Sequence, residues 1–185
     1  MDAETQPRFD LAAEAVPGPV ALGFLPQTAR FSLRIDPGQL AAASRAAGLS
    51  LPGRIGEAAQ ERTRRALCLG PDEWALWGEE AEGGAIEASF AAIYPETPHS
   101  LVATGDREVA VSLEGPEALT LLSVGCPTDL AGLAVGQGKR TVFDGVQVVL
   151  YREAQERYAL EVWRSFLPHV WALLNTGNRE LALGL

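Results

Sequence analysis

Alternating apolar and polar residues predict a series of β-strands along the chain. Between residues 107 and 113 the apolar residues Val109, Val111 and Leu113 take every second position, which gives a strand one buried face. Residues 29–35 alternate in the same way. Further strands are expected over residues 65–69, 73–77, 100–104, 140–144, 145–152 and 158–163. The Gly-Pro-Asp turn over residues 70–72 should join two of these strands in a hairpin.

Stretches with helical spacing or helix-forming composition lie between the strands. Pro116 suits a first helical turn, because its φ is fixed near the helical value and it has no N–H to satisfy. The apolar residues after it repeat at i, i+3, i+4 and i+7, namely Ala118, Leu121, Leu122 and Gly125. The other helices are expected over residues 39–47, from about 84 to 94 and from 166 to about 176, the last with Ser165 as its N-cap.

The order of these elements predicts an α+β fold made of two similar halves. Each half begins as a strand, a helix and two strands, so mostly antiparallel sheets with helices on one side are expected. Residues 29–185 should form a single compact domain, with halves at about 29–105 and 106–185. Residues 1–28, which contain four prolines, are predicted as an extended arm on the surface or on a partner, and residues 49–60 as a loop.

Composition and charge exclude several classes of function. The chain has 185 residues, of which 47% are apolar, and this is enough for a sizeable core. Its formal net charge is −9 and its basic residues are scattered, so no nucleic acid partner is expected. Asp2 and Glu4 stand where a secretion signal is basic, and no apolar run approaches the ~20 residues of a membrane span. A cytoplasmic protein with no membrane partner is expected.

Sequence motifs for cofactor, metal and nucleophile chemistry are missing. The glycine-rich stretch over residues 132–140 has Leu133 and Arg140 where a P-loop needs a glycine and a serine or threonine. No Gly-x-Ser-x-Gly motif occurs. Cys68 and Cys126 lack the neighbouring Cys or His residues of a zinc site, so both are expected to be reduced and buried. We therefore expect no cofactor and no metal in this chain.

Aromatic residues near the C-terminus are the candidates for a contact surface. Trp163 and Trp171 flank the end of the last predicted strand and the last helix, and Arg164 adjoins the first of them. Large aromatic side chains usually belong to a core. Because Trp and Arg are also enriched at protein interfaces, Trp163, Arg164 and Trp171 form a candidate interface, with a core role as the alternative.

Four segments of the sequence, taken together, resemble a known family. They are DREVAVSLEGPEALTLLSVGCPTDL at residues 106–130, LCLGPDEWALW at 67–77, the stretch 98–107, and YALEVWRSFLPHVWALL at 158–174. Their amino-acid sequences resemble the folate-binding aminomethyltransferase superfamily and, within it, most closely the gamma subunits of heterotetrameric sarcosine oxidases. The resemblance covers well over half of the chain and implies an aminomethyltransferase-like α+β fold.

The resemblance also implies partners and a function. Heterotetrameric sarcosine oxidases oxidise sarcosine to glycine and pass the one-carbon unit to tetrahydrofolate or release it as formaldehyde. An accessory gamma subunit would assemble with alpha, beta and delta subunits. FAD, FMN, NAD, tetrahydrofolate and zinc would then belong to those partners. A homo-oligomer is the remaining option for the isolated chain. Two alternatives stay open: a free-standing folate-binding aminomethyltransferase-like protein, and the equivalent subunit of a related N-methylglutamate dehydrogenase.

Asp129 is the one catalytic candidate that the resemblance supplies. In aminomethyltransferases the aspartate of an Asn-Asp-Val turn is catalytic, and Asp129 falls on that position. Thr128 replaces the asparagine, however, and the acidic pair of the next hairpin is missing at residues 147–149. The resemblance therefore implies a chain that is not the catalytic centre.

Overall fold

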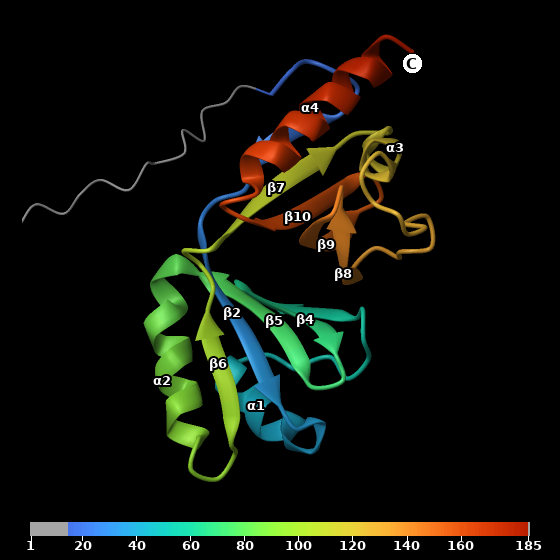
Figure 1. Ribbon diagram of the computed structural model, residues 1–185. Coiled ribbons are helices and arrows are strands. Elements are labelled where there is room, and N and C mark those ends of the chain that lie inside the picture. The colour runs from blue at the N-terminus through green and yellow to red at the C-terminus, as the bar shows by residue number, and fades with distance from the viewer. Residues whose placement is uncertain (1–14, 185) are drawn as a thin grey trace, which may run out of the picture.

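The computed structural model describes residues 15–184 and shows two antiparallel β-sheets with helices on their outer faces (Figure 1). The first half contains β2 (Thr28–Ile35), α1 (Leu40–Ala47), β3 (Ala58–Glu61), β4 (Arg64–Gly70), β5 (Glu73–Glu79), α2 (Gly83–Ile93) and β6 (His99–Ala103). The second contains β7 (Glu108–Glu114), α3 (Ala118–Ser123), β8 (Gly138–Phe143), β9 (Val146–Ala154), β10 (Arg157–Trp163) and α4 (Leu167–Ala182). An additional strand, β1 (Ala21–Phe24), precedes both.

The two sheets repeat the same strand order over the described residues. One runs β3-β4-β5-β2-β6, and the other runs β8-β9-β10-β7-β1. The strand before the first helix of each half is therefore the fourth in its sheet. In the second sheet, β1 from the start of the described chain takes the place that β6 holds in the first. The second sheet is thus completed by residues that precede the first half in sequence.

Strand alternation explains the two cores. On β2 the side chains of Phe31, Leu33 and Ile35 point to one face and pack with α1 and α2 in one hydrophobic cluster. On β7, Val111 and Leu113 do the same in a second cluster with α3 and α4. The opposite faces of the two sheets meet each other, as the contact of Arg30 of β2 with β10 shows. The layers therefore run helices, sheet, sheet, helices (Figure 1).

The predicted α+β class with helices on one side of each sheet is confirmed, whereas two strands were not predicted. Strand β3 lies in the segment predicted as a loop, and β1 lies in the predicted arm. β1 pairs antiparallel with β7, far along the chain. The part of the arm over residues 1–14 lies outside the described residues.

The last helix differs from its prediction at both ends. Phe166, not Ser165, is the N-cap residue of α4, and no side-chain hydrogen bond caps it. The helix continues past residue 176 to Ala182, and two of its asparagines bind the chain before β1. Asn178 accepts from the Val20 N–H at 3.1 Å, and Asn175 accepts from the Val16 N–H at 2.7 Å. Among the described residues, no helix is both long enough and apolar enough to span a membrane.

Candidate functional site

Charged side chains gather in the cleft where the two sheets face each other. The two at its centre come from strand positions whose neighbours on either side belong to a hydrophobic core. Arg30 lies between Ala29 and the buried Phe31 on β2, and Glu161 lies between Leu160 and Val162 on β10. Because strand side chains alternate, a charged residue at such a position must face the other sheet. The cleft is therefore built by the same alternation that builds the cores.

The centre of the cleft is a buried ion pair. The Arg30 Nε–H donates to Glu161 Oε2 at 2.8 Å, and the Trp77 Nε1–H donates to Glu161 Oε1 at 3.1 Å. Arg30 and Glu161 are 3% and 5% exposed, so neither charge has water as an alternative partner. Burial raises the pKa of the Glu161 carboxyl above its ordinary value, although Arg30 acts in the opposite direction.

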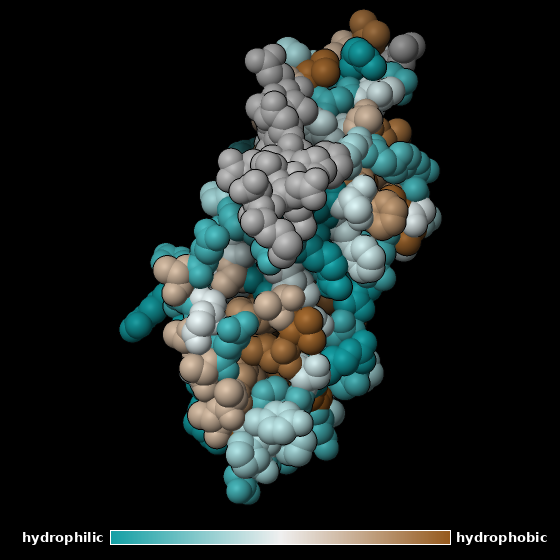
Figure 2. Space-filling view, turned by 60° about the vertical axis from the view of Figure 1, so that its left-hand side comes forward, coloured by the Kyte–Doolittle hydropathy of each residue, from teal (hydrophilic) through white to brown (hydrophobic). Residues whose placement is uncertain are grey.

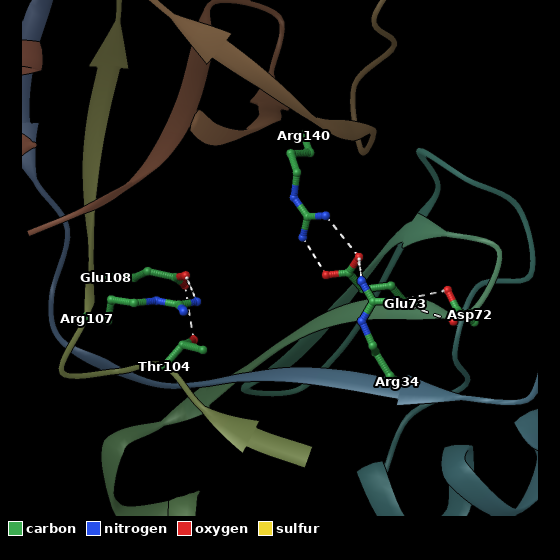
Figure 3. Close-up of polar contacts among 7 residues, drawn as sticks. All are labelled: Arg34, Asp72, Glu73, Thr104, Arg107, Glu108 and Arg140. Carbon is green, nitrogen blue, oxygen red and sulfur yellow. Dashed lines mark hydrogen bonds and ion pairs between the residues drawn. The ribbon is translucent and has the colours of Figure 1, made fainter. Parts of the chain in front are cut away.

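A second cross-sheet pair joins Glu73 of β5 to Arg140 of β8 (Figure 3). Arg140 binds both carboxylate oxygens of Glu73, with Nη1 donating to Oε2 at 2.9 Å. Arg34 of β2 donates to the same carboxylate at 3.0 Å and also reaches the exposed Asp72. Hydrogen bonds from Arg140 hold the pKa of Glu73 below its ordinary value against the opposing effect of burial.

A third cross-sheet pair joins Arg65 of β4 to Glu153 of β9 at 3.1 Å. The Arg65 guanidinium lies between two aromatic rings, 4.6 Å from the Trp77 ring centre and 4.5 Å from the Tyr151 ring centre. Guanidinium stacking on aromatic faces adds a favourable cation–π contribution. In all three pairs one partner comes from each half, so the charges hold the halves together.

The polar cleft encloses only a small cavity. Its volume is about 80 Å³, and Trp77, Glu161, Glu73 and Arg140 are among the residues that line it. Sites for cofactors and drug-sized molecules typically measure about 300–1,000 Å³. A cofactor therefore does not fit in this cavity. In the part of the chain that the structure describes, no group of His, Cys, Asp and Glu side chains is arranged to hold a metal ion.

A wider pocket of about 350 Å³ opens on the other side of Trp77 and Glu161. Arg30 and Arg65 line it. Both guanidinium groups already bind carboxylates of this chain, Glu161 and Glu153. An anionic ligand in this pocket would have to compete with those carboxylates.

The structure places Asp129 away from any buried acid–base environment. It is exposed in the turn after α3, where its Oδ1 accepts from the Ala131 N–H at 2.8 Å. This is a local turn contact of a common kind. The neighbouring Thr128 hydroxyl lies 3.5 Å from the Thr141 hydroxyl of β8. The catalytic role of Asp129 stays a prediction.

The three predicted interface residues fall in two different settings. Trp163 is half-buried and lies 4.8 Å from the Arg107 guanidinium, and the Arg164 Nε–H donates to the Asp106 carbonyl at 3.1 Å. Both therefore contact residues 106–107, which connect the two halves. Trp171 is buried and stacks on Phe24 of β1, with ring centres 4.4 Å apart. The interface role of these residues stays a prediction, and Trp171 offers little surface for it.

Sequence reasoning missed the cross-sheet pairs. None of Arg30, Arg65, Glu73, Arg140 and Glu161 was a candidate. One signal was available in the segment 158–163. It is apolar at nearly every position, which indicates that both faces of the strand are covered, so its one glutamate had to be buried with a partner.

Comparison with known proteins gives consistent matches. The model of the family described as "Sarcosine oxidase, gamma subunit family" matches residues 33–180. The sarcosine oxidase subunit gamma of Corynebacterium sp. (strain U-96) is 32% identical over 147 residues, covering 77% of this chain and 71% of that protein. The subunit of the same name from Arthrobacter sp. is 31% identical over 153 residues, covering 80% and 74%.

Solved structures show the same likeness. A chain of the heterotetrameric sarcosine oxidase from Corynebacterium sp. U-96, in complex with pyrrole 2-carboxylate, matches with a TM-score of 0.82 and 28% identity. The match covers 91% of this chain and 89% of that chain. The glycine cleavage system aminomethyltransferase T from Bartonella henselae matches with a TM-score of 0.66 and 16% identity, over 85% of this chain and 45% of that chain. The latter likeness shows a shared fold alone.

Proposed function

Because the chain belongs to the sarcosine oxidase gamma subunit family, we propose that it works as the gamma subunit of a heterotetrameric sarcosine oxidase. The observation that carries this proposal is the extent of the structural match. It covers 91% of this chain and 89% of a chain of such a complex, so the whole fold is shared. Neither a free-standing aminomethyltransferase-like protein nor a subunit of an N-methylglutamate dehydrogenase is favoured.

The proposed role is in assembly of the complex and not in its chemistry. The complex would demethylate sarcosine oxidatively to glycine, and the alpha, beta and delta subunits would carry the reacting groups. Two features of the chain support this. The charged groups between its sheets bind one another. The one catalytic candidate, Asp129, is exposed and bonded within its own turn.

The space between the two halves is poorly suited to tetrahydrofolate. The cavity of about 80 Å³ is well below the size of a cofactor site. In the wider pocket of about 350 Å³, Arg30 and Arg65 already bind Glu161 and Glu153, so an anionic cofactor would have to compete with those carboxylates. We therefore place folate, FAD, FMN, NAD and zinc in the partner subunits, and we derive no reaction step in this chain. Assembly in the cytoplasm is part of the same proposal.

Co-purification tests the proposal. The full chain, carrying an affinity tag, is co-expressed with the alpha, beta and delta subunits of the same organism's sarcosine oxidase. The proposal predicts a complex that contains one copy of each chain by native mass spectrometry. Recovery of the tagged chain without the other three, while those three form a complete and active enzyme, would overturn it.

A further inference from the structure

Strand β6 leaves one edge of the first sheet open. Within the described part of the chain it pairs only with β2. The Thr104 N–H donates to the Arg30 carbonyl at 2.8 Å. Since every second residue of an antiparallel strand hydrogen-bonds to its partner, this bond shows which residues of β6 face β2. The N–H and C=O groups of Leu101 and Ala103 must then point away from β2, toward the free edge. These outward backbone groups are available to an added strand.

The open edge lacks the usual protection against pairing. Edge strands are commonly guarded by charged side chains. Residues 99–103 contain no Asp, Glu, Lys or Arg. The opposite edge, β3, carries Glu61, and the neighbouring edge of the second sheet, β8, carries Lys139. Strand β1, the counterpart of β6, has three of its four residues partly buried. Of the two edges without Asp, Glu, Lys or Arg, β6 and β1, β6 is the more exposed.

Helix α2 lies beside this edge and presents an apolar surface. Figure 2 shows hydrophobic residues gathered on this side of the first half. The exposed apolar residues on the helix side of this edge are Ala91 and Tyr94 of α2 and Ala103 of β6. Two grooves, of about 530 and 250 Å³, lie between α2 and the two ends of β6. An added strand would therefore rest its apolar side chains against α2.

Acidic residues border the grooves, and their charge limits which kind of chain can bind there. Glu87 lines both grooves, and Glu80 and Asp106 line the smaller one. Arg30 also lines the smaller groove, but its guanidinium binds Glu161. A two-fold dimer through this edge would bring the same acidic residues of two copies together, which is unfavourable. Charge complementarity favours a different chain that carries lysine or arginine.

We propose that the edge of β6 binds an extended, apolar segment of a partner subunit, flanked by lysine or arginine residues, as an additional strand of the first sheet. Strand addition of this kind gains affinity from main-chain hydrogen bonds and specificity from alternate side chains. The proposal rests on the proposed function, since it needs the partner subunits of the complex.

Matched charge substitutions test the proposal in the full complex. Val102→Lys places a charge on the edge, and Val135→Lys is its control, because the two valines are 52% and 51% exposed. Glu87→Lys reverses the groove charge, and Glu156→Lys is its control at an exposed site in the second half. Binding of each purified chain to the other three subunits is measured by titration. Val102→Lys and Glu87→Lys should weaken binding at least about tenfold, and the controls should stay within about twofold.

Hydrogen exchange of residues 99–103 supplies the direct readout of strand addition. The proposal predicts slower amide exchange there in the assembled complex than in the free chain. Unchanged exchange, or full binding by Val102→Lys, would overturn the proposal while leaving the proposed function intact. A wild-type dimer that Val102→Lys makes monomeric would also overturn it, in favour of a second copy. Failure of the wild-type chain to join the complex would overturn both.

Discussion

Loss of the Glu161 carboxylate should destabilise the protein strongly, because Arg30 would stay buried without its counter-ion. The substitution Glu161→Leu keeps most of the side-chain volume and removes both hydrogen-bond acceptors, which now bind Arg30 and Trp77. Breaking a buried pair by removing one partner typically costs about 3–5 kcal/mol. That is a large part of the roughly 5–15 kcal/mol by which folded proteins are stable.

The expected change in melting temperature follows from the chain length. For domains of 150–250 residues, 1 kcal/mol corresponds to about 2–4 °C. Glu161→Leu should therefore lower the melting temperature by roughly 6–20 °C. The double variant Arg30→Met with Glu161→Leu removes both charges, and such replacements are often neutral or stabilising. The double variant should be much more stable than Glu161→Leu alone.

Urea unfolding of the isolated chain at pH 7, followed by circular dichroism, measures these differences. The wild type, both single variants and the double variant form a thermodynamic cycle whose coupling term reports the pair. Equal slopes of the unfolding free energy against urea would show that the variants unfold in the same way. A loss below about 1 kcal/mol for Glu161→Leu, or a double variant as unstable as the sum of the singles, would refute the reasoning.

Three further predictions concern other residues. Arg164→Ala should leave the isolated chain folded but weaken assembly by about 1–4 kcal/mol; an equal drop in melting temperature of the free chain would assign Arg164 to the link between the halves. Glu73→Gln should destabilise the chain at pH 7. Because the pKa of Glu73 is lowered in the folded state, the difference in free energy of unfolding between the wild type and this variant should shrink as the pH falls below about 4.3. Urea unfolding of both proteins between pH 7 and pH 3 measures this difference. Burial raises the pKa of the Cys68 thiol, and that of Cys126 to about 11, so neither should react with a thiol reagent at pH 8 before urea is added. Rapid labelling of the native chain would contradict their burial.

The order of strands and helices could be predicted wherever one face of an element is apolar. The alternation of Phe31, Leu33 and Ile35 and of Val109, Val111 and Leu113 is local, so it marks β2 and β7 without knowledge of their partners. The resemblance to sarcosine oxidase gamma subunits, inferred from four segments, is confirmed by the family match.

The elements that depend on distant partners could not be predicted. Strand β1 has four residues between prolines, and it is a strand because it pairs with β7 and because Phe24 stacks on Trp171. The central ion pair joins residues 131 positions apart in sequence, and no local pattern links them. Asn175 and Asn178 of α4 bind residues before β1, 159 and 158 positions away in sequence, and no local pattern links them either.

The central claim, that this chain assembles with an oxidase without performing its chemistry, is tested most directly by activity and absorbance together. Sarcosine-dependent peroxide formation is measured with the purified full chain, with the other three subunits, and with all four, and the flavin absorbance bands are recorded for each sample. We expect the chain alone to be colourless and inactive, and turnover and flavin colour to appear with the partner subunits. Flavin bound to the isolated chain, or peroxide formed by it without partners, would contradict the claim.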